Sequence, residues 1–287
     1  MYYLLLFIVY PLSLLPMRVL YIFSDAFFVF AYHIVGYRRW LVMENLYHAF
    51  PEKTELELKQ ICKTFYRSFC DQWIETLKLV SMSENALNKR ISGNWEVFEQ
   101  LHNAGKNTYA LLGHTFNWEW ANVACQYNAL QQFAGVYMPV KNKAFDRLMQ
   151  RIRKRGNGIL ISMMSKKSGF QQLEGRYMVG LIADQNPSNL KSAVWLPFMN
   201  REAPFFKGPE QLARRDKAAV VFAGIKKVKR GNYEVKLELL TDDASQTQSG
   251  SIMQQYVNFM ERQLREQPAN WLWTHRRWKH RKEDYRP

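Results

Sequence analysis

His114 and Glu119 lie five positions apart, directly after the apolar run from Thr108 to Leu112. A neutral imidazole can take a proton from an alcohol near pH 7, and a carboxylate can fix its tautomer and stabilise the imidazolium. These two residue types therefore indicate a general base that activates a hydroxyl group. Such a pair also occurs by chance. Its place after a strand makes it informative, because sites gather at the carboxyl ends of parallel strands.

The spacing of the pair requires a turn. Positions five apart on a helix point roughly 140° from each other, so the two side chains cannot share one helical face. A sharp turn at Gly113, with Asn117 as the N-cap of a helix from Trp118 to Leu130, would place Glu119 in the first helical turn. From there its carboxylate would reach back to the imidazole. Backbone N–H groups at this turn are also suited to stabilise an oxyanion.

The rest of the chain alternates short apolar runs with amphipathic ones, which predicts an α/β fold with a mostly parallel mixed sheet flanked by helices. A basic connection between the last two runs predicts an antiparallel hairpin at one edge. Further helices are expected before Leu79 and over Ser251 to Gln267. The predicted strands are Tyr109 to Leu112, Phe133 to Tyr137, Gly158 to Met163, Tyr177 to Ala183, Ala218 to Ile225 and Tyr233 to Leu240.

The N-terminal segment, residues 1–36, is predicted to bind a membrane. Met1 to Met17 carries no charge, and the chain then continues apolar and aromatic to about Gly36. Pro11 and Pro16 make a kinked helix or an interfacial helix pair as consistent as a straight crossing. A buried pair of core helices is the alternative. Residues 37–287 are expected to form one domain on the cytoplasmic side, because the remainder is strongly basic.

The net charge of +15 over 287 residues indicates an anionic partner or surface. Nucleic acid, anionic lipid and an acidic carrier protein all qualify. No RNA- or DNA-binding motif is recognisable, so we expect no nucleic acid partner. The three cysteines, Cys62, Cys70 and Cys125, have no metal-binding spacing and predict neither a disulfide framework nor a metal site. Cys125 is interpreted as a small buried residue and not as a nucleophile.

Four further motifs join the His/Glu segment. They are Asn45 to Pro51, Tyr137 to Asn142 leading to Asp146 and Arg153, the strand end Ala183-Asp184-Gln185, and Trp271 to Lys279. In this order the five motifs resemble the late acyltransferases of lipid A biosynthesis, the lauroyl/myristoyl transferase branch of the lysophospholipid acyltransferase superfamily. The resemblance covers nearly the whole chain.

The resemblance implies a protein of the bacterial inner membrane that moves a fatty acyl chain from acyl carrier protein, or coenzyme A, to a hydroxyl of a glycolipid. It places the family's catalytic pair on His114 and Glu119, with His114 as the base and Glu119 as its orienting acid. Attack on the thioester would then be direct, without an acyl-enzyme. The implied partners are acyl carrier protein, a glycolipid acceptor and membrane lipid. No cofactor or metal is implied beyond the acyl thioester itself.

The same resemblance marks Asn142, Arg153, Asp184 and Gln185 as substrate-binding candidates. Arg153 is interpreted as a phosphate contact or as one more charge on a basic helix. Asp184 and Gln185 either hold the loops of the site or touch substrate. Phe116 and the segment from Pro204 to Gly208 depart from the family's smaller or Thr-rich residues, so chain length and acceptor are left open.

Two apolar stretches, Ile159 to Met164 and Trp195 to Phe206, either line a groove for an acyl chain or pack in the core. The cationic and aromatic segment from Arg276 to Lys282 suits lipid headgroups or an acidic carrier, or is a solvated tail. Transfer to another phosphoglycolipid or to an amino lipid would use the same base. A thioesterase, in which water replaces the acceptor, belongs to a different class and also fits the motif.

Overall fold

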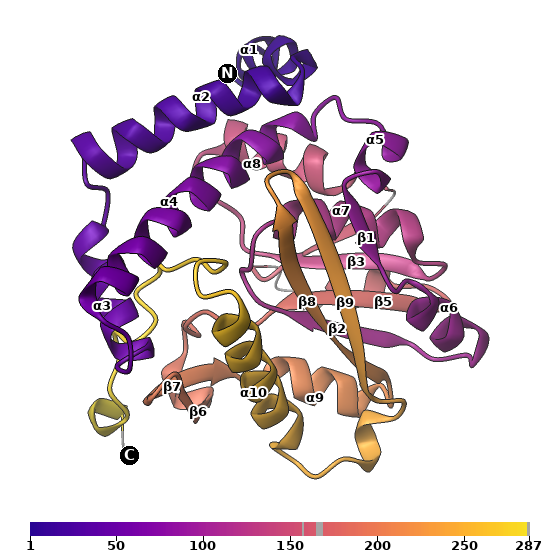
Figure 1. Cartoon of the computed structure of the whole chain (residues 1–287). Coiled ribbons are helices and arrows are strands. Elements are labelled where there is room, and N and C mark those ends of the chain that lie inside the picture. Colours follow the sequence, from indigo (N-terminus) through magenta and orange to yellow (C-terminus); the bar gives the residue numbers. More distant parts are fainter. Residues whose placement is uncertain (157, 165–168, 286–287) are drawn as a thin grey trace.

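The protein has a seven-stranded mixed sheet flanked by helices, as the sequence predicts (Figure 1). The computed structural model describes residues 1–156, 158–164 and 169–285. The strand order is β1-β9-β8-β2-β5-β3-β4, and every pair is parallel except β8 with β9. The strands are β1 (Ile91–Gly93), β2 (Thr108–Leu112), β3 (Gln132–Tyr137), β4 (Ile159–Ser162), β5 (Tyr177–Ile182), β8 (Ala219–Lys229) and β9 (Asn232–Thr241).

Helices cover both faces of the sheet, and each face has its own hydrophobic core. Side chains of a strand alternate between faces. Accordingly Tyr109 and Leu111 pack with α4, α9 and α10, whereas Met178 and Val221 pack with α6 and α7. The helices are α1 (Tyr2–Leu14), α2 (Met17–Phe28), α3 (Arg39–Ala49), α4 (Glu55–Lys78), α5 (Glu84–Asn88), α6 (Glu96–Asn103), α7 (Trp118–Asn128), α8 (Lys143–Arg153), α9 (Gly208–Arg215) and α10 (Ser251–Glu266), with a π-helical continuation of α2 at Val29–Ile34.

The predicted antiparallel hairpin exists as β8 and β9, but it does not form the edge of the sheet. The short strand β1 pairs with β9 from the outside. Three residues carry too little periodicity to be recognised in the sequence. A second antiparallel pair, β6 (Ala193–Phe198) and β7 (Arg201–Phe206), forms a separate two-stranded sheet within the stretch predicted to be a groove or core segment.

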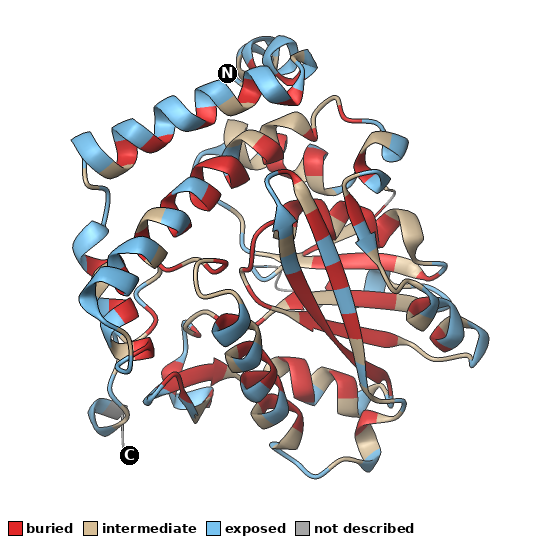
Figure 2. Cartoon of the chain, in the orientation of Figure 1, coloured by how far each residue is buried: buried red, intermediate tan, exposed pale blue. Residues whose placement is uncertain are grey.

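The N-terminal helices lie against the side of α4 (Figure 1). In α2, buried residues face inward and exposed apolar residues face outward, as Figure 2 shows. Polar contacts attach α2 to the main body. Tyr21 donates to Glu75 (2.8 Å) and Ser24 donates to Asp71 (2.7 Å). Arg230, at the β8–β9 connection, pairs with Asp25 of α2 at 2.7 Å.

Candidate active site

The turn between β2 and α7 is built as the sequence predicts. Asn117 is the N-cap of α7, and its side-chain oxygen accepts a hydrogen bond from the backbone N–H of Trp120 at 3.1 Å. Its side-chain nitrogen donates to the buried carboxyl group of Glu75 at 2.8 Å. Because both ends of the Asn117 amide are engaged, the entry into α7 has one defined orientation. Glu119 accordingly lies in the first turn of the helix.

His114 is held by Asp184, at the end of the neighbouring strand β5. Strands β2 and β5 are parallel neighbours, with Leu112 opposite Ile182, so the residues that follow both strands meet at one edge of the sheet. The Nδ1 atom of His114 lies 2.7 Å from Oδ1 of Asp184, and the backbone N–H of His114 donates to Oδ2 at 2.8 Å. Asp184 is therefore the carboxylate that orients the imidazole.

Asp184 is ionised at neutral pH. Burial by itself would raise its pKa, but the charge of His114 and hydrogen bonds from His114 and the Trp271 indole lower the pKa to about 2. An ionised carboxylate only accepts hydrogen bonds, so Nδ1 of His114 carries the proton. In the neutral imidazole, Nε2 is then the nitrogen with the lone pair. It lies 3.3 Å from the side-chain nitrogen of Gln185, which fits an amide that donates to the Nε2 lone pair.

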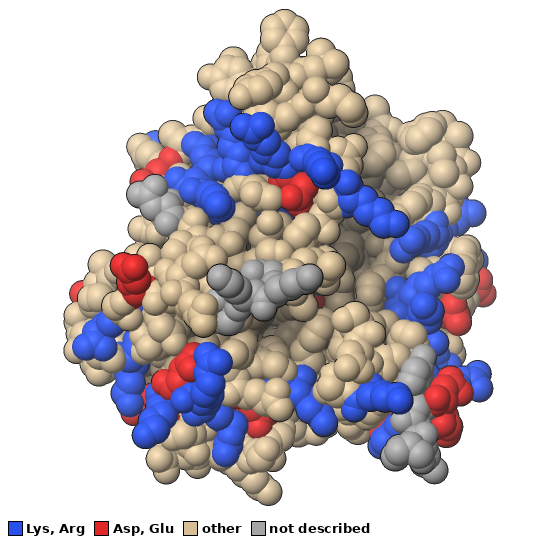
Figure 3. All heavy atoms as spheres, turned by 180° about the vertical axis from the view of Figure 1, so that it is seen from behind, with Lys and Arg blue, Asp and Glu red and all other residues tan. Residues whose placement is uncertain are grey.

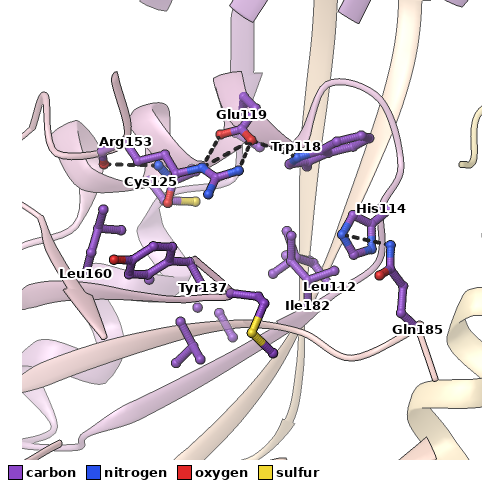
Figure 4. Close-up of a pocket in the computed structure, with 18 of the residues that line it drawn as sticks. Leu112, His114, Trp118, Glu119, Cys125, Tyr137, Arg153, Leu160, Ile182 and Gln185 are labelled. Atoms are coloured by element: carbon purple, nitrogen blue, oxygen red, sulfur yellow. Dashed lines mark hydrogen bonds and ion pairs between the residues drawn. The ribbon is translucent and has the colours of Figure 1, made fainter. Parts of the chain in front are cut away.

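The expected pairing of Glu119 with His114 is not what the structure contains. Glu119 is buried and is gripped by Arg153, whose Nε lies 2.9 Å from Oε2 and whose Nη2 lies 2.5 Å from Oε1 (Figure 4). The Trp118 indole donates to the same carboxylate at 3.1 Å. Burial would lower the pKa of Arg153, but the charge of Glu119 raises it, so the guanidinium stays charged. The contact between Glu119 and Arg153 could not be predicted from the sequence, because it depends on how α8 packs on α7.

His114, Glu119, Arg153 and Gln185 all line one cavity of about 380 Å³ between α7 and the sheet (Figure 4). Its floor is the sheet face that carries Ala110, Gly135 and Gly180, where a methyl group and two glycine hydrogens leave space under α7. A Cβ on Gly180 would lie 3.0 Å from the Phe133 ring. The rest of the lining is mostly apolar. The cavity is thus a largely apolar chamber with a histidine base and one ion pair in its wall.

Residues from both predicted groove stretches reach this cavity. Leu160 and Met163 come from the first stretch, and Phe206 comes from the second. Other members of these stretches are buried in the core, such as Phe198 and Phe205. The two interpretations of the sequence, groove and core, thus apply to different residues of the same segments.

Two other candidates have plain structural positions. The Asn142 side chain caps α8 by accepting hydrogen bonds from the backbone N–H groups of Ala144 and Phe145 at 3.0 and 3.1 Å. Asn142 is exposed and does not line the cavity. Cys125 does line it, but burial raises the pKa of its thiol to about 12. A neutral thiol is a poor nucleophile, which agrees with the interpretation of Cys125 as a packing residue.

Two backbone donors of the turn are used internally. The N–H of His114 binds Asp184 and the N–H of Trp120 binds Asn117. These two groups therefore cannot serve the predicted oxyanion site without breaking the turn. The Arg153 guanidinium and the Gln185 amide both line the cavity. They offer side-chain N–H donors in place of the backbone N–H groups.

Three residues that support the site were not predicted from the sequence. Trp271 donates to Asp184 at 2.6 Å and so helps to keep its carboxylate charged. Glu75 accepts hydrogen bonds from Asn117, Tyr21 and Tyr233 at 2.7 to 2.8 Å. Arg277 is fully buried between the segment after β5 and β7. For Glu75, the available signal was a charged residue on the buried face of a helix. Trp271 belongs to a motif that was recognised in the sequence, but no role was assigned to its side chain.

The fold and the cavity define an α/β protein with a hydrogen-bonded histidine–aspartate pair beside a largely apolar cavity. Among the described residues, no group of three or more His, Cys, Asp or Glu side chains is arranged to hold a metal ion. The chain matches the family of bacterial lipid A biosynthesis acyltransferases over residues 1–280, and it belongs to that family. The protein is therefore an acyltransferase of lipid A biosynthesis. The comparison with curated proteins gave no match.

Proposed function

We propose that the protein transfers a fatty acyl chain from a carrier thioester to a hydroxyl group of a lipid A precursor, with His114 as general base. One observation carries this proposal. The Nε2 atom of His114 is made a proton acceptor by ionised Asp184, and it stands at the wall of an apolar cavity. A base beside a chamber for a hydrocarbon chain suits attack on an acyl thioester.

In the proposed reaction the acyl chain lies in the cavity and the acceptor hydroxyl replaces Gln185 at Nε2 of His114. The hydroxyl oxygen bonds to the thioester carbonyl carbon while its proton passes to Nε2. The tetrahedral intermediate then collapses, the carbon–sulfur bond breaks, and the thiolate takes the proton back from the imidazolium. No acyl-enzyme forms. Asp184 stabilises the imidazolium, and general base catalysis of this kind contributes about 10² to 10⁴-fold.

The ion pair of Glu119 and Arg153 has a different role in this proposal. Glu119 fixes the guanidinium at the cavity wall through two of its nitrogens. The positive charge of Arg153 then faces the site where negative charge develops on the carbonyl oxygen or where a phosphate group of the acceptor arrives. Glu119 thus supports catalysis by placing Arg153 and not by orienting His114.

For the acyl donor we propose acyl carrier protein. Its acidic surface would meet the basic face of α8, which exposes Lys143, Arg147, Arg151 and Lys154. Figure 3 shows Lys and Arg side chains gathered in a band across the upper part of one face of the molecule. Arg153, which lines the cavity, belongs to the same helix. Coenzyme A, an anionic carrier as well, is the alternative donor.

We further propose that the protein lies on the cytoplasmic face of the inner membrane, with α1 and α2 in the lipid interface. The helix over Met17–Ile34 is long and apolar enough to cross a membrane. However, Tyr21, Ser24 and Asp25 bind Glu75, Asp71 and Arg230 of the main body. A crossing would draw these charged groups into hydrocarbon, at a cost of several kcal/mol for each unsatisfied group. An interfacial position leaves the polar side on the protein and puts the exposed apolar side into lipid.

The direct test is an acyl-transfer assay with the purified full-length protein in lipid or detergent. Radiolabelled acyl carrier protein thioester and a lipid A precursor should yield a glycolipid heavier by one acyl group, as seen by mass spectrometry. The His114→Ala variant should yield none while keeping its fold. Release of free fatty acid at the same rate with and without acceptor would identify a thioesterase and overturn the proposal.

A further inference from the structure

A second pocket opens beside the catalytic cavity and is not part of the proposed chemistry. Its walls are the segment after β5, from Asn186 to Lys191, and the C-terminal residues His275, Arg276, Lys279 and His280. Asn186 and Ser188 line both the pocket and the catalytic cavity. The two spaces are therefore neighbours that share a wall.

The second pocket is cationic. Lys191, Arg276 and Lys279 contribute three positive charges to its lining, and none of the described residues that line it is acidic. Arg276 and Lys279 are exposed and lie three positions apart in the same segment. A planar guanidinium beside ammonium groups is the arrangement that binds phosphate, because it offers several charge-assisted hydrogen bonds. The chemical class of the ligand is thus a phosphate-bearing anion.

The pocket is held in shape by buried contacts behind it. Asn186 donates to the carbonyl oxygen of Arg276 at 2.9 Å and accepts from Arg277 at 2.5 Å. The Arg277 side chain is fully buried, donates to the carbonyl oxygen of Pro204 at 2.8 Å, and lies over the Phe205 ring at 4.2 Å. These contacts tie the two walls together. The segment from Arg276 onward is therefore not a loose basic tail where it lines the pocket.

Both chain segments that form the walls of the second pocket also contact His114. Gln185, which contacts Nε2 of His114, is followed by Asn186 of the pocket. On the other wall, the backbone N–H of Leu272 donates to the carbonyl oxygen of His114 at 3.2 Å, three residues before His275. One molecule that presents a hydroxyl group to His114 would therefore extend its neighbouring groups into the cationic pocket.

The rim of the pocket also borders α3, the helix that follows the apolar N-terminal segment in the chain. The guanidinium carbon of Arg276 lies 6.0 Å from the ring centre of Trp40, which is 62% exposed on α3. Arg38 at the start of the same helix donates to the carbonyl oxygen of Thr274 at 3.0 Å. The rim thus carries an exposed aromatic side chain of the kind that lies at membrane surfaces, four residues after the apolar N-terminal segment. This neighbourhood favours a membrane-resident acceptor over the soluble donor as the source of the phosphate.

We propose that the pocket formed by Lys191, Arg276 and Lys279 binds a phosphate group of the glycolipid acceptor and so presents its hydroxyl group to His114. This inference rests on the proposed acyl transfer to a lipid A precursor, and it assigns the phosphate contact to residues other than Arg153. These cations act in substrate binding and not in the chemical step.

The test compares two arginines of one segment in the full-length protein. Arg276→Gln removes a pocket cation, and Arg281→Gln removes another exposed cation that does not line the pocket. We expect Arg276→Gln, and Lys279→Gln as a second variant, to raise the KM for the acceptor about tenfold or more. The kcat at saturating acceptor, the KM for the acyl donor and vesicle binding should stay within twofold of wild type. The Arg281→Gln variant should match wild type throughout.

Each other outcome overturns the inference. An unchanged acceptor KM in both pocket variants would leave the pocket without this role. An increase in the donor KM alone would assign the pocket to the phosphate of the donor's carrier arm. Equal losses in Arg281→Gln would indicate a general effect of charge at the membrane. A wild-type protein that acylates no glycolipid at all would instead overturn the proposed function.

A second arm uses the acceptor in place of the protein. The same glycolipid stripped of phosphate should show, with the wild-type protein, the KM increase that Arg276→Gln shows with the intact acceptor. With Arg276→Gln, the stripped acceptor should cause little further loss, because the contact is already missing. If the two increases in acceptor KM multiply when both changes are combined, Arg276 and the phosphate group are not in contact.

Discussion

Asp184 accepts two hydrogen bonds from His114, one from its ring at 2.7 Å and one from its backbone at 2.8 Å. One carboxylate thus fixes both the rotation of the imidazole and the loop that carries it. The residues come from the ends of two neighbouring parallel strands. The orientation of the base is therefore a property of the sheet and not of the short segment around His114.

Replacing Asp184 should harm activity more than replacing Glu119. In Asp184→Asn the neutral amide no longer stabilises an imidazolium and permits the wrong tautomer, so kcat should fall by about 10² to 10⁴-fold. In Glu119→Gln the base keeps its partner and the loss should be smaller. Steady-state transfer assays on both variants check the order. A larger loss for Glu119→Gln would return the orienting role to Glu119.

The Glu119–Arg153 pair should show strong energetic coupling. Breaking a buried pair from one side leaves an uncompensated charge, which costs about 3 kcal/mol. We therefore expect the double variant Glu119→Gln/Arg153→Met to lose less unfolding free energy than the sum of the losses in the two single variants. Denaturant unfolding of the four proteins gives the coupling. The exposed pair of Lys59 and Glu55, 2.7 Å apart, is the control and should show no detectable coupling. Additive effects in the buried pair would contradict the prediction.

The stabilising effect of Asp184 should disappear in acid. Its pKa is lowered from 3.8 to about 2 in the folded protein, so the contribution is complete above the ordinary pKa and is lost as pH falls toward 2. By linkage, the free energy of unfolding of wild type relative to Asp184→Asn should fall by about 1 kcal/mol between pH 5 and pH 3. Thermal or denaturant unfolding at both pH values measures this difference. A gap that does not change with pH would mean that Asp184 is not held as an anion.

Gly180 should limit the length of the acyl chain accepted. A side chain at this position enters the cavity floor next to the Phe133 ring, so Gly180→Val should shorten the space available to a hydrocarbon. Losing the burial of two methylene groups costs about 1.6 kcal/mol, or roughly fifteenfold in relative kcat/KM for the longer donor. Competition between donors that differ by two carbons gives this ratio directly.

Gly224→Val is the matched control for that variant, because Gly224 lies on strand β8 next to Gln263 of α10 and does not line the cavity. It should change stability without changing the ratio between donors. The same shift in both glycine variants would show that chain length is read elsewhere.

Deleting residues 1–36 should leave a poorly soluble protein. The deletion removes the partners that Tyr21 and Ser24 provide for Glu75 and Asp71, and it uncovers the side of α4 on which α2 packs. Sedimentation after expression, together with activity in the soluble fraction, checks the outcome. A soluble and fully active truncation would show that these helices are dispensable.

The order of elements was readable from the sequence because apolar periodicity reports local structure. Other features were recognised from residue types. The N-cap at Asn117 follows from its side chain, the β8–β9 hairpin from the short connection between two apolar runs, and the Asp184-Gln185 strand end from the motif after an apolar run. The partner of His114 was not recognised, because it depends on β2 lying beside β5. Strand order in a parallel sheet is set by crossover connections, which leave no periodic signal. Glu119 was the nearer carboxylate in sequence, and the sheet brought a more distant one to the imidazole.

The fastening of α2 has a mechanical consequence. Its polar contacts reach α4 through Tyr21 and Ser24 and the β8–β9 connection through Asp25. With attachments to two separate elements, the N-terminal helices cannot swing independently of the sheet. In the proposed interfacial position, these attachments would hold the whole sheet at one depth and tilt relative to the lipid surface.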